Sequence, residues 1–216
     1  MSAEEPTPLK LRSDLHLARK IWHIGGVSFI AGVYAILPHS ASVALLTLAW
    51  LMFVPLDFAR LKYPHLNVHM VRVFRPIMRQ NELHKLAGTS FLLTGLLLVT
   101  LIFPPPIVLL TMFFLAFADP IASYFGIRYG KDKILGEKSL QGFMAAFIVC
   151  ALLTFTFLNS YELFSGRVVL VSLIGGLIGA LAELIPIGKL DDNLTLPVLS
   201  AVSLWGLFSM FGAVYA

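Results

Sequence analysis

The sequence predicts an all-α, polytopic membrane protein with about seven transmembrane helices. Of its 216 residues, 58% are hydrophobic and only 13% are charged, whereas soluble domains are about a quarter charged and under half apolar. The apolar residues also gather into stretches near the roughly 20 residues that a spanning helix needs. These observations argue against a soluble enzyme, a disordered protein and a nucleic-acid binder, and the lone Cys150 excludes an intrachain disulfide.

Seven such stretches follow one another along the chain. They cover residues 21–38, 41–58, 86–103, 106–126, 140–158, 168–185 and 195–214. With these spans, all but Arg167 of the 16 lysines and arginines fall on one side of the membrane. The positive-inside rule makes that side the cytoplasm, so we expect a cytoplasmic N-terminus and a C-terminus outside.

The segments between the spans predict the domain organisation. Residues 1–18 form a polar cytoplasmic segment without the features of a cleavable signal peptide, and residues 19–216 form a single transmembrane domain. The stretch 63–84 has an apolar and a basic helical face. The apolar face comprises Leu66, Met70, Phe74 and Met78, and the basic face comprises Arg72, Arg75 and Arg79. This pattern predicts an amphipathic helix at the cytoplasmic interface, kinked near Pro76, with a solvated linker as the alternative.

Three carboxylates at the cytoplasmic ends of predicted spans are candidate functional residues. Asp119 lies in the fourth span before Pro120, Glu183 closes the sixth, and Asp192 opens the seventh; Asp57, in the second, is a weaker candidate. A charged side chain inside a bilayer costs about 2.5–3.5 kcal/mol on insertion scales, so its presence there indicates a function. Glycines share the helical faces of Asp119 and Glu183, and they serve either close helix packing or the approach of a ligand.

Basic residues lie on the same side as these carboxylates. The loop after the fourth span carries Lys131, Lys133 and Lys138 and leads into a helix for which Ser139 is the expected N-cap. Free amide groups at a helix N-terminus and lysine charges both favour phosphate, and contact of the loop with anionic lipid is an equal alternative.

A second basic set opens the first span. Arg19, Lys20 and His23 share one helical face, where the histidine either packs or faces a phosphate. Carboxylate oxygens suit Mg²⁺, which usually shares substrate phosphates. The combination of these groups favours metal-assisted chemistry on a nucleotide or lipid phosphate at the inner leaflet.

Four motifs occur in order along the chain. They are Arg19-Lys20-x-x-His23; Asp119-Pro120-Ile-Ala-Ser-Tyr-Phe-Gly126 with Gly130-Lys131; Lys138-Ser139-x-x-Gly142; and Asp192-Asn193-Leu-Thr-Leu-Pro197. Together they resemble the CTP-dependent lipid kinase family, which includes dolichol kinases, phytol kinases and CTP-using diacylglycerol kinases and is related to the CDP-diacylglycerol synthases. The resemblance spans residues 17–204, and the chain is similar to the compact bacterial versions.

The resemblance implies Mg²⁺-dependent transfer of the γ-phosphoryl group of CTP to the hydroxyl of a lipid alcohol, either diacylglycerol or an isoprenoid alcohol such as a polyprenol. The implied metal ligands are Asp119, Glu183 and Asp192, and the implied catalytic residues are Asp119, Asp192 and Lys138. The residues implied to contact CTP are Arg19, Lys20, His23, Gly126, Gly130, Lys131, Lys133, Ser139, Gly142 and Asn193. Secondary or lipid-facing residues are Glu82, Gly88, Ser90, Ser123 and Thr195.

Other functions stay open as alternatives. A phosphatidate cytidylyltransferase would attack the α-phosphate of CTP, but the longer acidic signature of those relatives is absent near the C-terminus. An ion-coupled transporter would place polar residues on both membrane sides, and a scaffold would not need clustered carboxylates. We expect CTP, a lipid alcohol and membrane lipids as partners, and no nucleic acid. We also expect a site facing the cytoplasm from a bacterial inner membrane, and a homo-oligomer is compatible with the sequence.

Overall fold

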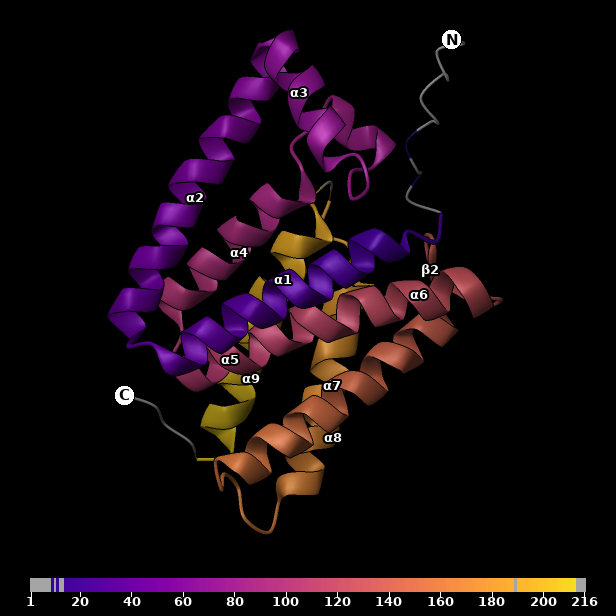
Figure 1. Cartoon of the computed structure of the whole chain (residues 1–216). Coiled ribbons are helices and arrows are strands. Elements are labelled where there is room, and N and C mark those ends of the chain that lie inside the picture. Colours follow the sequence, from indigo (N-terminus) through magenta and orange to yellow (C-terminus); the bar gives the residue numbers. More distant parts are fainter. Residues whose placement is uncertain (1–8, 10, 12–13, 189, 213–216) are drawn as a thin grey trace.

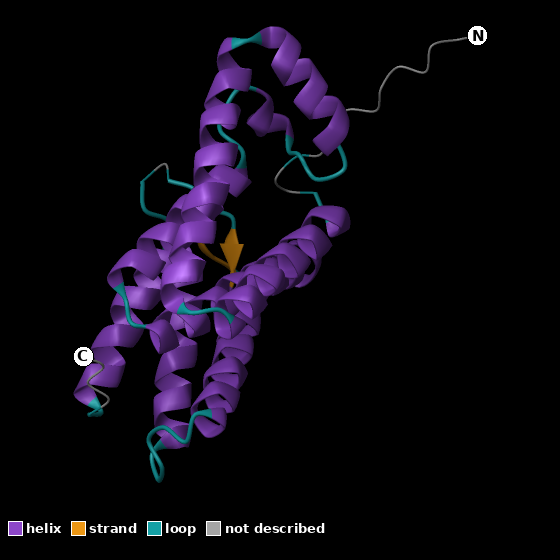
Figure 2. Ribbon diagram, turned by 60° about the vertical axis from the view of Figure 1, so that its left-hand side comes forward, coloured by secondary structure: helices purple, strands orange, loops and turns teal. Residues whose placement is uncertain are grey.

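The computed structural model describes residues 9, 11, 14–188 and 190–212, and this part of the chain is almost entirely helical (Figures 1 and 2). The helices are α1 (Leu17–Ile36), α2 (His39–Lys62), α3 (Pro64–Phe74), α4 (Gly88–Ile102), α5 (Pro105–Phe113), α6 (Asp119–Tyr129), α7 (Leu140–Ser160), α8 (Val168–Leu184) and α9 (Asp192–Met210). Shorter elements are the 3₁₀ turn η1 (Gln80–Leu83), the π-helical turn η2 (Phe114–Ala118), and the strands β1 (Lys133–Leu135) and β2 (Lys138–Ser139). Most of the predicted polar segment 1–18 and the end of the last predicted span, 213–214, lie outside the described residues.

Each of the seven predicted spans corresponds to helical chain in this structure. By length and composition, four described helical segments can cross a membrane: His39–Lys62, Pro105–Tyr129, Leu140–Ser160 and Asp192–Met210. The apolar helices α4 and α8 are shorter, and at 1.5 Å per residue they reach only about 22 and 26 Å, below the roughly 30 Å hydrocarbon core. The count of seven spans and the orientation of the termini therefore stay predictions.

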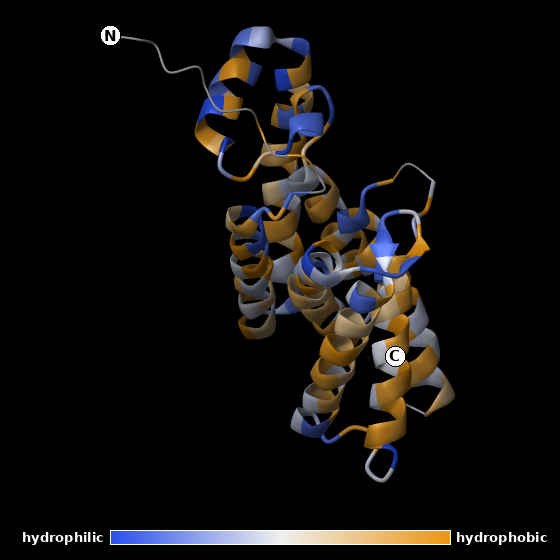
Figure 3. Cartoon of the chain, turned by 90° about the vertical axis from the view of Figure 1, so that its right-hand side faces the viewer, coloured by the Kyte–Doolittle hydropathy of each residue, from blue (hydrophilic) through white to orange (hydrophobic). Residues whose placement is uncertain are grey.

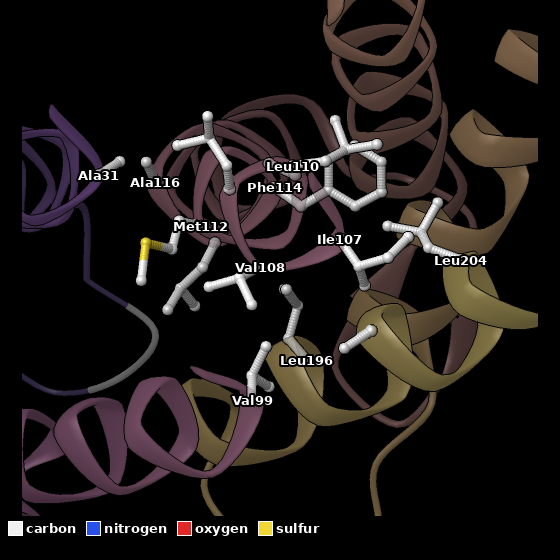
Figure 4. Packing of buried hydrophobic residues seen from close by; sticks show 14 of the residues in the cluster. Ala31, Val99, Ile107, Val108, Leu110, Met112, Phe114, Ala116, Leu196 and Leu204 are labelled. Carbon is white, nitrogen blue, oxygen red and sulfur yellow. The ribbon is translucent and has the colours of Figure 1, made fainter. Parts of the chain in front are cut away.

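The core surrounds the segment that runs from α5 through η2 into α6. Its side chains Ile107, Leu110 and Phe114 are completely buried, and Figure 4 shows residues of α1 and α9, such as Ala31 and Leu196, in the same cluster. Helices α1, α4, α7 and α9 all contact α5. This central segment carries Asp119 directly after η2, so the candidate carboxylate is fixed by the best-packed part of the chain.

The all-α prediction misses a small β-hairpin between α6 and α7. Strands β1 and β2 pair antiparallel, with Lys133 opposite Ser139. Gly136, in the turn, has a φ of +56°, a left-handed conformation that glycine adopts at no steric cost. The glycine-rich loop therefore folds back on itself before α7 begins. Ser139 is the predicted N-cap of α7, and this prediction is confirmed, because its Oγ accepts a hydrogen bond of 3.2 Å from the Gly142 amide.

Helix packing explains the glycines that share a face with Glu183. A Cβ atom added at Gly176 would lie 2.7 Å from the Cβ of Ala151, and one at Gly179 would overlap the Sγ of Cys150. A Cβ at Gly142 would lie 2.9 Å from the carbonyl oxygen of Ala122. These glycines let α8 and α6 approach the backbone of α7, which is the common use of small residues between membrane helices.

Replacement of Gly179 by alanine is expected to lower the free energy of unfolding by about 1–3 kcal/mol, because the added methyl group overpacks the contact with Cys150. Thermal unfolding of the detergent-solubilised protein measures the effect. Gly206→Ala is the matched control, because a Cβ there meets no atom within 4 Å and alanine is the better helix former. Equal melting temperatures for the two variants would contradict the close α7–α8 contact.

The predicted amphipathic helix over 63–84 is helical only in its first half. Helix α3 ends at Phe74, two residues before Pro76, whose ring disfavours a helical residue before it. A turn and η1 complete the stretch, and Met78 is buried there. Figure 3 shows hydrophilic residues gathered around this end of the molecule and around the hairpin, while apolar residues dominate the helices beyond.

Candidate functional site

A π-helical turn precedes Asp119 and exposes a backbone carbonyl to α1. The Nε2 atom of His23 lies 2.9 Å from the carbonyl oxygen of Leu115, within η2. Because a carbonyl only accepts, Nε2 carries the proton in this contact. The same nitrogen lies 4.0 Å from Oδ2 of Asp119. π-Helical turns are frequent at functional sites, and this one joins α1 to the helix that carries the candidate carboxylate.

A second contact between α1 and α6 lies on α6, one helical turn beyond Asp119. Lys20 donates a hydrogen bond of 2.6 Å from Nζ to Oγ of Ser123. Lys20 and His23 therefore flank the first turn of α6 and place two cationic or polar groups beside Asp119. The helical face predicted from their spacing is the face that meets α6.

Lys138 joins the hairpin to the inner ends of α8 and α9. Its Nζ donates to Oε1 of Glu183 at 2.5 Å, to the Glu183 carbonyl oxygen at 2.9 Å and to Oδ2 of Asp192 at 3.2 Å. Burial alone would lower the pKa of Lys138, but the charges of Glu183 and Asp192 outweigh it and hold this pKa above its ordinary value. The lysine is therefore a fixed positive charge between two acids.

Arg19 is engaged by Glu82 on the segment that leads into α4. Its two terminal nitrogens donate to the two carboxylate oxygens of Glu82 at 2.9 and 2.8 Å. Glu82 also accepts from the amides of Arg79 and Gly88, each at 2.9 Å. Burial alone would raise the pKa of Glu82, but Arg19 and these amides hold it below its ordinary value. The sequence resemblance implies a nucleotide contact for Arg19, whereas in the structure both terminal nitrogens of its guanidinium bind the carboxylate of Glu82.

These elements surround a polar pocket of about 40 Å³ at the starts of α1, α6 and α9. The residues that line it are Asp14, His16, Arg19, Lys20, His23, Arg79, Asp119, Pro120, Ser123, Asp191, Asp192 and Asn193. Asp191 caps α9 and accepts from the backbone amide and the side-chain amide of Asn193 at 3.0 and 2.7 Å. These twelve residues form the polar pocket. It gathers basic side chains and carboxylates from segments more than 100 residues apart in the chain.

Other predicted site residues lie outside the polar pocket wall. Lys131 and Lys133 are exposed on the hairpin, where Nζ of Lys133 donates to the Glu137 carbonyl oxygen at 2.8 Å. Ser90 donates from Oγ to Asp57 at 2.6 Å, and Thr195 is buried on α9. Gly126, Gly130 and Gly142 surround Ser139 at the contact of α6 and α7, and Gly88 lies against Arg19 and Asn193.

The chain is similar in sequence to three proteins that carry one name. The chain is 30% identical over 182 residues to "CTP-dependent diacylglycerol kinase 1" of Saccharomyces cerevisiae, an alignment that covers 76% of this chain and 63% of the relative. It is 31% identical over 204 residues to the protein of the same name from Eremothecium gossypii, covering 85% and 64%. The protein of that name from Schizosaccharomyces pombe is 31% identical over 159 residues, covering 69% of this chain and 73% of the relative.

This chain belongs to the CTP-dependent lipid kinase family. It spans a little under two thirds of the length of the Saccharomyces and Eremothecium relatives. No family model matches it, and no solved structure does.

In this lipid kinase family member, the polar pocket has a donor set that fits a magnesium ion. Asp119 and Asp192 line the pocket with side chains that are 25% and 21% exposed. Among the described residues, no three His, Cys, Asp or Glu side chains gather closely enough to hold an ion by themselves. Mg²⁺ typically takes one or two carboxylates and completes its coordination with water and substrate phosphates. The carboxylate of Glu183, the third predicted ligand, instead accepts a hydrogen bond from Lys138.

Sequence reasoning missed an ion pair that fixes the segment containing Glu82. Arg60 is 1% exposed and donates from Nε to Asp57 at 2.5 Å, and from its terminal nitrogens to the carbonyl oxygens of Glu82 and Lys85 at 2.9 and 2.8 Å. Asp57 also accepts from the Ala87 amide at 2.8 Å. The i,i+3 spacing of Asp57 and Arg60 is the signal that could have found this pair. Arg79 was predicted on the basic face of an amphipathic helix, but it lies beyond the end of α3 and lines the polar pocket.

Replacement of Arg60 by methionine is expected to lower the free energy of unfolding by about 3–5 kcal/mol, because it leaves the buried Asp57 carboxylate without its charge partner. The thermal unfolding midpoint in detergent reports the change. Arg72→Met, on the exposed side of α3, is the control and should leave the midpoint within error. An Arg60→Met variant as stable as the control would show that the Asp57–Arg60 pair does not anchor the segment that contains Glu82.

Proposed function

We propose that this chain is a CTP-dependent lipid alcohol kinase, transferring the γ-phosphoryl group of CTP to a lipid hydroxyl at the cytoplasmic face of the membrane. One observation carries the proposal: the polar pocket gathers Arg19, Lys20 and Arg79 beside Asp119 and Asp192. Phosphoryl transfer needs mainly positioning and neutralisation of phosphate charge, and these residue types supply both. The names of the relatives make diacylglycerol the first substrate to test, with an isoprenoid alcohol as the second.

The residues of the polar pocket divide into binding and positioning groups. Asp119 and Asp192 would hold the magnesium ion, which supplies charge neutralisation on the phosphates when bound. Lys20 and Arg79 contribute positive charge on the pocket wall for the phosphate oxygens. His23 contacts the π-helical turn and keeps the start of α6 in place. Lys138 stays charged and orients Asp192 from outside the pocket wall.

The experiment that tests the proposal measures whether the α or the γ phosphate of CTP reaches the lipid. The purified protein in lipid receives Mg²⁺, diacylglycerol or a polyprenol, and CTP labelled at the α or the γ phosphate. We expect label in the lipid only from γ-labelled CTP. A parallel reaction receives phosphatidate as the acceptor, and label from α-labelled CTP in CDP-diacylglycerol, with release of pyrophosphate, would identify a cytidylyltransferase instead. Absence of label from both, together with ion flux in liposomes, would overturn the enzyme proposal.

The location of the site in the cell rests on the distribution of charge. All but one of the 16 lysines and arginines lie on the side of the polar pocket when the seven predicted spans are applied. We propose that the pocket faces the cytoplasm, where CTP is available, from a bacterial inner membrane. Accessibility of a cysteine introduced at Lys133, on the exposed hairpin, to an impermeant thiol reagent tests this placement, and labelling in intact cells would contradict it.

A further inference from the structure

An apolar cavity lies beside the polar pocket, enclosed by α1, α2, α3, the turn after α3 and the start of α4. It measures about 90 Å³, against about 40 Å³ for the polar pocket. Its walls include Trp22, Phe53, Met70, Phe74 and Met78. Methionine and aromatic side chains of this kind adapt to flexible apolar ligands. In Figure 1, α2 leads away to α3, and the chain then returns to α4; residues of all three helices and of α1 line the cavity.

Arg19 lines both the cavity and the polar pocket. Its guanidinium is held by both oxygens of Glu82, and Glu82 also lines the cavity. The Arg19–Glu82 ion pair is therefore the boundary between a space suited to phosphate and a space suited to hydrocarbon. A ligand with an apolar body and one polar end would place that end at Arg19.

The outer rim of the cavity is apolar and open. Trp22 is 59% exposed on α1 and Phe53 is 42% exposed on α2, and α2 is one of the segments that can cross a membrane. Tryptophan at a helix end is typical of the membrane interface. An acyl chain that enters the cavity can therefore continue past these two side chains into the bilayer. Thr89 also lines the cavity, and its hydroxyl group can hydrogen-bond an ester or hydroxyl oxygen.

From this arrangement we infer that the apolar cavity is the binding site for the lipid alcohol, a diacylglycerol whose glycerol end lies at the Arg19–Glu82 pair and whose acyl chains pass Trp22 and Phe53. The inference rests on the proposed function, because that function supplies the lipid acceptor. It assigns α3 a role in substrate binding and separates the lipid acceptor from the CTP phosphates by a single ion pair.

The test compares two tryptophan substitutions on the same helix. Met70→Trp fills the cavity, whereas Val73→Trp adds the same ring to an exposed position of α3 outside the cavity wall. If the tryptophan ring displaces about two methylene groups of the lipid from the cavity, the lost burial weakens binding and corresponds to a roughly tenfold rise in KM for diacylglycerol. We expect this rise for Met70→Trp with KM for CTP unchanged, and neither change for Val73→Trp. Equal effects of the two variants, or a parallel rise in both KM values for Met70→Trp, would overturn the assignment.

A binding measurement without CTP keeps this inference separate from the activity. A diacylglycerol analogue with a diazirine on its acyl chain is photo-crosslinked to the full chain in lipid nanodiscs. We expect labelled peptides from α3 and the start of α4, loss of label with excess unlabelled diacylglycerol, and less label for Met70→Trp and Met70→Ala. If such labelling occurs but no γ-phosphate reaches any lipid, the proposed function fails while the cavity assignment stands. If phosphate is transferred but the label lies elsewhere or is unaffected by both Met70 variants, the cavity assignment fails alone.

Discussion

Replacement of Asp119 by asparagine is expected to reduce lipid phosphorylation by at least about 100-fold, because it removes a charge that would hold magnesium against the CTP phosphates. The fold should persist, since asparagine has nearly the same shape, the Asp119 side chain is 25% exposed, and Oδ2 of Asp119 is as far as 4.0 Å from Nε2 of His23. Transfer of label from γ-labelled CTP to diacylglycerol measures the activity, and the thermal unfolding midpoint measures the fold.

Asp132→Asn is the matched control for this prediction. Asp132 is an exposed acid on the loop that precedes β1, and Oδ2 accepts from Gln141 at 2.7 Å, a role that an asparagine oxygen can also fill. Its activity should equal that of the unchanged protein. Full activity of Asp119→Asn would remove this residue from the site. A loss of activity that parallels a loss of folded protein would assign it a structural role.

Replacement of Lys138 by methionine has the second largest expected effect, and it acts on both stability and activity. Glu183 is buried with Lys138 as its ion-pair partner, so the variant leaves a buried carboxylate unpaired at a cost of about 3 kcal/mol. Asp192 also loses its contact with Nζ, which removes one of the contacts that hold its carboxylate at the wall of the polar pocket. We expect phosphoryl transfer to fall by about 100-fold.

A double variant separates the two effects of Lys138. Adding Glu183→Gln to Lys138→Met removes the unpaired charge, so the melting temperature should rise toward that of the unchanged protein. Activity should stay low, because Asp192 still lacks its contact with Nζ. Recovery of activity together with stability would show that Lys138 serves only the fold. A single Lys138→Met variant with full activity and stability would contradict both parts of the prediction.

Local features of the fold could be predicted from the sequence. The positions of helices followed from apolar stretches, because the hydrophobic length of a segment is a property of that segment alone. The cap at Ser139 followed from residue type, and the structure bears it out. The hairpin was missed because the glycines that permit its turn are equally suited to a phosphate-binding loop, and the strand residues are too few to show an alternating pattern.

The candidate site could be predicted only in part. Spacing along α1 placed Lys20 and His23 on one face, and the structure shows that this face meets α6. The partner of Arg19 could not be predicted in this way, because Glu82 lies 63 residues further along the chain. Lys133 and Lys138 have the same charge and lie in the same loop, yet the hairpin turns one toward water and the other toward Glu183.

The amino-acid sequence alone is enough to predict a helical membrane protein with four motifs of a lipid kinase family in order. The seven spans that it predicts would place nearly all the basic residues on one side of the membrane. Hydrophobicity and residue type act locally, so their consequences can be predicted without the three-dimensional structure. Which charges meet becomes evident only in the folded chain, where Lys138 pairs with Glu183 and Asp192, and Arg19 pairs with Glu82. These pairs form only when segments distant in the chain pack together, and the Arg19–Glu82 pair then lies between the polar pocket and the apolar cavity.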